Sequence, residues 1–137
     1  MDLAKYRALF LEEATEHLAE MSRALLDLEK DPATGEAIEV VFRMAHSIKS
    51  MAASLEYTAI ADVSHRLEDR MEVVRSAGRV DGAEDLGLLF RGLEGLERMV
   101  GTVRDTDEPP AGDPELLSAL AGLGSSVEDP PAKKVTS

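Results

Sequence analysis

Hydrophobic residues recur every three or four positions along most of this chain. In the first segment they form a stripe through Tyr6, Phe10, Ala14, Leu18, Met21, Leu25 and Leu28. At roughly 100° per residue these side chains share one face, so the pattern predicts a helix over about residues 2–29. Residues 31–35 then combine a proline with turn-forming residues and separate this helix from the next.

The same spacing predicts three further helices. The second carries Ile38, Val41, Ala45, Ile48 and Ala52 and ends near Ala53. The third follows Thr58, a predicted N-cap, and closes at the turn of residues 77–82. The fourth covers about residues 83–104 and contains Gly87, Gly92, Gly95 and Gly101. Each glycine costs on the order of 1 kcal/mol relative to alanine, so we expect this helix to be the least stable, or to use the missing side chains for close approach.

A linker at residues 107–112 precedes a short fifth helix. Asp113 is its predicted cap, and the helix covers about residues 113–123. Four amphipathic helices joined by short turns favour an all-α, up-down-up-down four-helix bundle at about residues 2–105, with the fifth helix covering one end. We therefore expect one domain at residues 1–124 and a disordered linker toward further domains at residues 125–137.

Composition and charge narrow the function classes. Aromatic residues make up 4% of the 137, so the core must be built mainly from Leu, Ala, Met and Val, which favour helices. A net charge of −12 disfavours nucleic acid and anionic lipid as partners. There is no cysteine, no signal peptide and no long apolar run, so we expect a cytoplasmic protein without direct membrane contact.

Two polar pairs are the candidates for chemistry. His46 falls about 140° from the centre of the second helix's apolar stripe, so it should face solvent, with Lys49 one turn away. An ammonium beside an imidazole suits an anion such as a phosphoryl group. On the third helix, His65 and Glu68 also lie off the stripe. If these helices are antiparallel neighbours, Glu68 can accept a hydrogen bond from His46 and leave its other ring nitrogen nucleophilic.

Residues 42–53, Phe-Arg-Met-Ala-His-Ser-Ile-Lys-Ser-Met-Ala-Ala, resemble the phosphorylation motif of the histidine-phosphotransfer domain of the chemotaxis kinase CheA family. The likeness extends over about residues 2–104. His46, Lys49, His65 and Glu68 occupy the matching positions. The resemblance implies that His46 is the phosphoacceptor, that Lys49 helps to hold the phosphoryl group, that Glu68 orients the imidazole, and that His65 positions Glu68.

The resemblance also implies partners and cofactors. A kinase catalytic domain of the parent protein would use ATP and Mg²⁺ to phosphorylate this domain in trans within a dimer. A response regulator receiver, with its own Mg²⁺, would take the phosphoryl group. The domain itself shows no glycine-rich phosphate loop, so we expect that it does not phosphorylate itself from ATP. We also expect no bound cofactor, no metal and a monomer when isolated. The parent would be bacterial and would associate with chemoreceptor arrays.

Ser50, Met51 and Ala53, which follow His46 on the second helix, are predicted to take part in docking. Ser50 stands where the family usually has glycine, a departure that would slow docking or transfer. Met51 replaces a second common glycine, and packing at the edge of the core is its favoured interpretation. Ala53 completes the set. His17, on the apolar face of the first helix, is interpreted as a partly buried histidine without a catalytic role.

Alternative functions remain open on the sequence. Within phosphorelays, the chain could be a stand-alone phosphotransfer protein, or a module of a kinase that controls motility other than swimming. A non-catalytic helical adaptor would make His46 and Glu68 incidental surface groups. A histidine-carboxylate metal site is a further alternative, although the acidic clusters lack the spacing of known cation sites.

Overall fold

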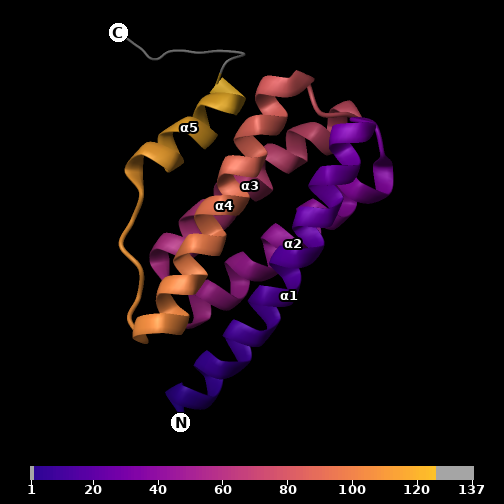
Figure 1. The fold of residues 1–137 in the computed structure, drawn as a ribbon. Helices are drawn as coiled ribbons and strands as arrows, with labels where there is room; N and C mark the ends of the chain where they lie inside the picture. Colours follow the sequence, from indigo (N-terminus) through magenta and orange to yellow (C-terminus); the bar gives the residue numbers. More distant parts are fainter. Residues whose placement is uncertain (1, 126–137) are drawn as a thin grey trace, which may run out of the picture.

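The computed structural model describes residues 2–125, and all the regular structure in this part of the chain is helical. The helices are α1 (Leu3–Lys30), α2 (Gly35–Ser54), α3 (Thr58–Ala77), α4 (Gly82–Thr106) and α5 (Pro114–Ser125) (Figure 1). The all-α prediction is confirmed, and the predicted helix bounds agree to within a few residues. The tail predicted as a linker lies outside the described residues, apart from Ser125 at the end of α5.

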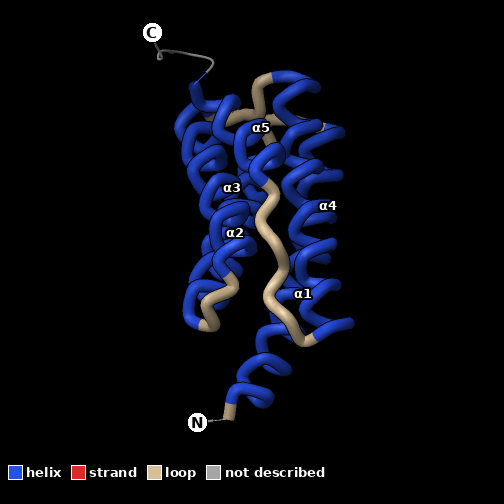
Figure 2. Tube along the Cα trace, turned by 90° about the vertical axis from the view of Figure 1, so that its left-hand side faces the viewer, coloured by secondary structure: helices blue, strands red, loops and turns tan. Residues whose placement is uncertain are grey.

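The first four helices form an up-down-up-down bundle (Figures 1 and 2). α1 packs against α2 and α4, and α3 packs against the same two helices. Within residues 2–125 no Cα atoms of the diagonal pairs, α1 with α3 and α2 with α4, lie within 8 Å of one another. Short connectors between consecutive helices produce this antiparallel square. None of the described helices is long and apolar enough to cross a membrane.

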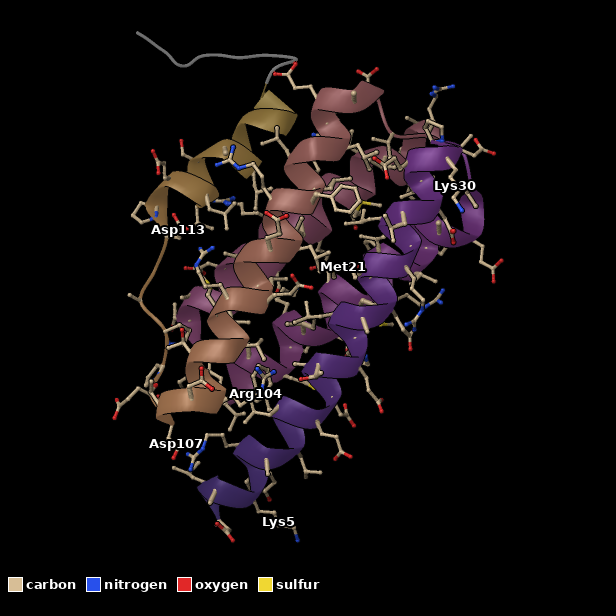
Figure 3. All side chains as sticks on the ribbon, in the orientation of Figure 1. Lys5, Met21, Lys30, Arg104, Asp107 and Asp113 are labelled. Carbon is tan, nitrogen blue, oxygen red and sulfur yellow. The ribbon has the colours of Figure 1, made fainter. Side chains whose placement is uncertain are left out.

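The predicted stripes build the core. Met21 lies inside the bundle and is fully buried, whereas Lys5, Lys30 and Arg104 lie at the surface (Figure 3). Tyr6 departs from the prediction, because its side chain is 45% exposed. The N-terminal end of α1 extends beyond the other helices, so there is too little neighbouring structure to cover it (Figure 2).

The start of α3 corrects the predicted N-cap. Tyr57 occupies the cap position, no side chain caps the helix, and Thr58 is its first residue. The Tyr57 ring is buried and packs edge-on against Phe10, with 5.2 Å between ring centroids. Burying an aromatic ring stabilises the fold by more than the ~1 kcal/mol typical of a side-chain cap, so the position that packs best sets the start of the helix.

The fifth helix also differs from its prediction. α5 lies along the side of the bundle, against α3 and α4, and does not cover an end (Figure 1). Its buried anchors are Leu116 and Leu120. Asp113 caps it as predicted, because its Oδ1 accepts a hydrogen bond of 3.1 Å from the Leu116 backbone N–H.

Two glycines of α4 let neighbouring helices approach closely, and one of them, Gly95, explains the placement of α5. A Cβ on Gly95 would collide with Leu116 of α5, and a Cβ on Gly92 would lie 2.7 Å from the Leu67 side chain. The prediction of close approach is therefore confirmed for these two positions. A Cβ on Gly87 would meet nothing within 4 Å, and a Cβ on Gly101 would meet only Arg104, at 3.8 Å.

Candidate functional site

His46 projects from the surface of α2. Its side chain is 56% exposed, whereas Ala45 and Ile48 on the core face of the same helix are fully buried. The prediction that His46 faces solvent is confirmed. The imidazole is therefore accessible to another protein while its backbone is held in a rigid helix.

Glu68 of α3 connects His46 to Lys49. Its Oε2 lies 2.5 Å from His46 Nδ1, and its Oε1 accepts a hydrogen bond of 2.5 Å from Lys49 Nζ. The predicted hydrogen bond between Glu68 and His46 is thus confirmed. The carboxylate bridges the imidazole and the ammonium, so one residue of α3 holds two residues of α2.

The charge of Glu68 determines which ring nitrogen is free. Burial raises the pKa of this carboxyl, but hydrogen bonds from Lys49 and His46 outweigh burial and lower the pKa below its ordinary value of 4.5. An ionised carboxylate can only accept hydrogen bonds, so His46 Nδ1 carries the proton and donates it. In the neutral imidazole this tautomer leaves the lone pair on Nε2, which is the requirement for a nucleophile.

A second group of contacts surrounds the imidazole, and sequence reasoning missed it. The Phe42 ring stacks on that of His46, with 6.5 Å between centroids and 14° between planes. Arg75 of α3 places its Cζ 4.2 Å from the centroid of Phe42. Its Nε and Nη2 donate to Glu39, at 2.8 Å and 3.2 Å. Phe42 lies one turn before His46, a spacing that signals contact, whereas nothing in the sequence singles out Arg75.

Comparison with known proteins identifies the family. A family model described as "Hpt domain" matches residues 5–106. This chain belongs to the Hpt domain family. The chemotaxis protein CheA of Bacillus subtilis is 33% identical over 128 residues, which is 93% of this chain but 19% of that protein. This chain therefore spans about a fifth of the length of this curated relative.

Solved structures share the fold of this Hpt domain. The solution structure of the histidine phosphotransfer domain of CheA has a TM-score of 0.79 at 26% identity, covering 95% of this chain and 97% of that one. The phosphorylated P1 domain of CheA3, in complex with CheY6 from R. sphaeroides, has a TM-score of 0.78 at 22% identity, covering 88% and 96%. The predicted histidine-phosphotransfer bundle is confirmed.

His65 does not join the hydrogen-bonded group of this Hpt domain. Its imidazole Nε2 lies 3.5 Å from Asp69 Oδ1, one turn further along α3. Within the described residues it has no hydrogen bond to Glu68, so the predicted contact between these two side chains is wrong. Spacing alone could not choose between the two acids, because positions three and four residues away are both neighbours on a helix.

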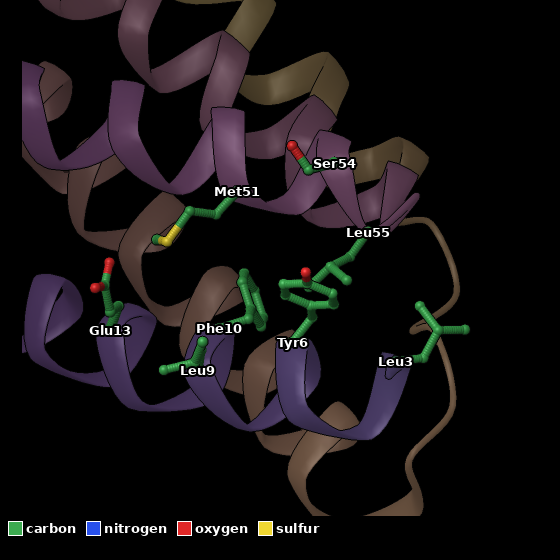
Figure 4. A pocket seen from close by; sticks show the side chains of 8 residues that line it. All are labelled: Leu3, Tyr6, Leu9, Phe10, Glu13, Met51, Ser54 and Leu55. Atoms are coloured by element: carbon green, nitrogen blue, oxygen red, sulfur yellow. The ribbon is translucent and has the colours of Figure 1, made fainter. Parts of the chain in front are cut away.

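The predicted docking residues of the Hpt domain lie beyond His46 on α2. Ser50 and Ala53 are exposed. Met51 is half-buried and packs against the core, as its favoured interpretation predicted. It also lines a pocket of about 380 Å³ between the N-terminal end of α1 and the C-terminal end of α2 (Figure 4).

His17 is half-buried at the contact of α1 with α2, in agreement with its predicted place. Its Nε2 lies 3.0 Å from Ser47 Oγ, so it connects α1 to the residue that follows His46. Within the described part of the Hpt domain, no three His, Asp or Glu side chains are grouped so that they could hold a metal ion.

Proposed function

We propose that His46 accepts a phosphoryl group from ATP at the catalytic domain of a chemotaxis-type histidine kinase and passes it to an aspartate of a response regulator receiver. One observation carries this proposal: the 2.5 Å contact between Glu68 Oε2 and His46 Nδ1 selects the tautomer in which the lone pair of the neutral, exposed ring lies on Nε2. The membership of the Hpt domain family supports it.

The proposed transfer consists of two displacements at phosphorus. His46 Nε2 attacks the γ-phosphorus of ATP, a nitrogen–phosphorus bond forms, and ADP leaves. The phosphorylated imidazole then carries positive charge, which the Glu68 carboxylate stabilises through the Nδ1 proton. In the second step a receiver carboxylate attacks the phosphorus, the nitrogen–phosphorus bond breaks, and the imidazole is regenerated. Lys49, held on Glu68, supplies a positive charge near the transferred group.

The partners belong to the same proposal. The kinase catalytic domain would lie elsewhere in the parent protein, where ATP and Mg²⁺ bind, and would act in trans within a dimer. The receiver would bring a second Mg²⁺, and this domain would bind no cofactor of its own. The CheA3 domain, whose fold this chain shares, was solved with CheY6, which supports a receiver as the partner class. Ser50, Met51 and Ala53 would lie at the docking face, in a cytoplasmic parent kinase associated with receptor arrays.

Radiolabel transfer tests the proposal. A CheA kinase core without its own Hpt domain is incubated with labelled ATP and with the wild-type chain, His46→Gln or His17→Gln. We expect label on the wild type and on His17→Gln, stable to base and labile to acid, and none on His46→Gln. His17→Gln is a suitable control, because His17 lies outside the group that contacts His46 and glutamine can still hydrogen bond to Ser47.

Two other outcomes would contradict the proposal. Equal labelling of the wild type and His46→Gln would mean that a different residue is the acceptor. Absence of label on every variant with several kinases, including the native one, would favour a helical adaptor instead. Circular dichroism on each variant ensures that a loss of label reflects chemistry and not unfolding.

A further inference from the structure

Four side chains form a row along one face of α2. Glu39, Phe42, His46 and Lys49 are spaced by three, four and three residues, so they lie on one side of the helix. Two residues of α3 face this row. Glu68 binds His46 and Lys49, and Arg75, two turns further along, binds Glu39. His46 therefore lies between two polar connections that join the same pair of helices.

The hydrogen bond to Glu68 restrains His46 only partly. It fixes one atom of the imidazole, Nδ1, but the torsion that turns a histidine ring about its Cβ–Cγ bond has a broad energy minimum. A side chain that is 56% exposed has few other neighbours to limit this rotation. A flat ring stacked on the imidazole would limit it, because rotation would break the near-parallel contact.

Phe42 provides such a ring, and Arg75 holds it. Phe42 is within 14° of parallel to the imidazole, and the Arg75 guanidinium lies 4.2 Å from its centroid, within range of a cation–π contact. Two hydrogen bonds from Arg75 to both carboxylate oxygens of Glu39 fix the plane of the guanidinium. These contacts connect Glu39, Arg75, Phe42 and His46 in one continuous series.

We propose that Phe42 and Arg75 are positioning residues, which hold the His46 imidazole so that its Nε2 lone pair keeps one direction. Phe42 restrains the ring, Arg75 restrains Phe42, and Glu39 restrains Arg75. The consequence for phosphoryl transfer rests on the function proposed above, whereas the restraint on the ring does not depend on that function.

Attraction of phosphate by Arg75 is the competing explanation. The Glu39 carboxylate neutralises much of the guanidinium charge at close range, through the two hydrogen bonds described above. The same pairing lowers the pKa of Glu39, so this carboxylate stays ionised at neutral pH. A paired arginine attracts an incoming phosphate less than a free one, and this favours a positioning role.

Four variants of the full chain test the proposal. Phe42→Leu removes the flat ring but keeps apolar volume, Phe42→Tyr keeps the ring, and Arg75→Lys keeps the charge but loses the planar fork. Phe90→Leu is the matched control, because Phe90 is also half-buried and packs against the core on α4. Two quantities are measured: the rate of phosphoryl transfer to the chain, and the order of the His46 ring by NMR relaxation.

We expect Phe42→Leu to lower the transfer rate about fivefold, the size of effect expected for one aromatic pair, and to lower the ring order. Phe42→Tyr should restore both quantities, Arg75→Lys should lower both to a smaller extent, and Phe90→Leu should change neither. NMR spectra of each variant confirm that it is folded.

Two results would overturn the proposal. Wild-type ring order in Phe42→Leu would show that Phe42 does not restrain His46. A wild-type transfer rate and wild-type ring order in Arg75→Lys would show that the charge of Arg75, and not its planar fork, is its contribution. Failure of the wild type to accept phosphoryl would contradict the proposed function alone, because the measurement of ring order still decides the positioning role.

Discussion

At the residue scale, Glu68 combines two conflicting physical effects. Its side chain is 11% exposed, and removal of a carboxylate from water disfavours the charged form. The hydrogen bonds from Lys49 and His46 favour that form and are the stronger influence, because the net pKa is lowered. The group that orients His46 is therefore also a group whose ionisation stabilises the folded bundle.

A pH series should reveal this contribution. Because the folded-state pKa of Glu68 lies below 4.5, its stabilisation is present above that pH and is lost as the pH falls through the lower folded-state value. Glu68→Gln should cost about 1–2 kcal/mol of unfolding free energy at neutral pH, and progressively less in acid. Urea unfolding at several pH values measures this difference.

Glu97→Gln provides the control of opposite sign. Burial, together with the neighbouring Glu94, raises the pKa of Glu97, so its ionised form disfavours folding. At neutral pH the unfolding free energy of Glu97→Gln should equal or exceed that of the wild type. The difference should decrease as the pH is lowered. A Glu68→Gln effect that stays constant with pH would mean that lost packing, and not lost charge, is responsible.

The residues of the site differ in how far the sequence reveals them. The exposure of His46 and its contact with Glu68 follow from helical periodicity and the antiparallel hairpin. The contact of Arg75 with Phe42 and Glu39 could not be predicted, because a long side chain can reach many positions on a neighbouring helix and spacing does not choose among them. His65 was predicted wrongly because Asp69 competes with Glu68 for the same imidazole.

At the element scale, α4 shows that glycines within one helix have different roles. Gly92 and Gly95 lie where Leu67 and Leu116 approach the helix backbone, whereas Gly87 faces open space. The sequence predicted that the helix would depend on packing but could not separate these positions, since the neighbours come from α3 and α5. The side-on placement of α5 was missed for the same reason.

Two alanine substitutions in α4 should therefore have opposite effects. Gly87→Ala should stabilise the protein by about 0.5–1 kcal/mol through helix propensity alone. Gly92→Ala would place a Cβ 2.7 Å from a Leu67 methyl group in the packed core. It should destabilise by about 1–2 kcal/mol despite the same gain in propensity. Chemical denaturation compares both variants with the wild type, and equal effects would contradict this account of packing.

At the scale of the whole molecule, the net charge of −12 is the dominant feature. A compact fold brings like charges closer together than the unfolded chain does. Their repulsion is therefore larger in the folded state and lowers the stability of the fold. Surface ion pairs such as Arg75 with Glu39 oppose this effect only locally.

Salt should therefore stabilise this protein. At 0.1 M salt, exposed charges more than about 10 Å apart are largely screened from one another. Added sodium chloride should therefore weaken the repulsion and raise the free energy of unfolding by about 1 kcal/mol. Thermal unfolding at low and moderate salt measures the change. A lower melting temperature at higher salt would mean that the ion pairs contribute more to stability than the net charge costs.

The hairpin of α2 and α3 contains every contact that shapes the site. Glu68 is 22 residues from His46 and 19 from Lys49, and Arg75 is 36 residues from Glu39. Closing loops this short costs little chain entropy, so these contacts can form early in folding. During synthesis, all of the partners are available once residue 77 has left the ribosome. The reactive face can then assemble on α1, α2 and α3 before α4 has left the ribosome.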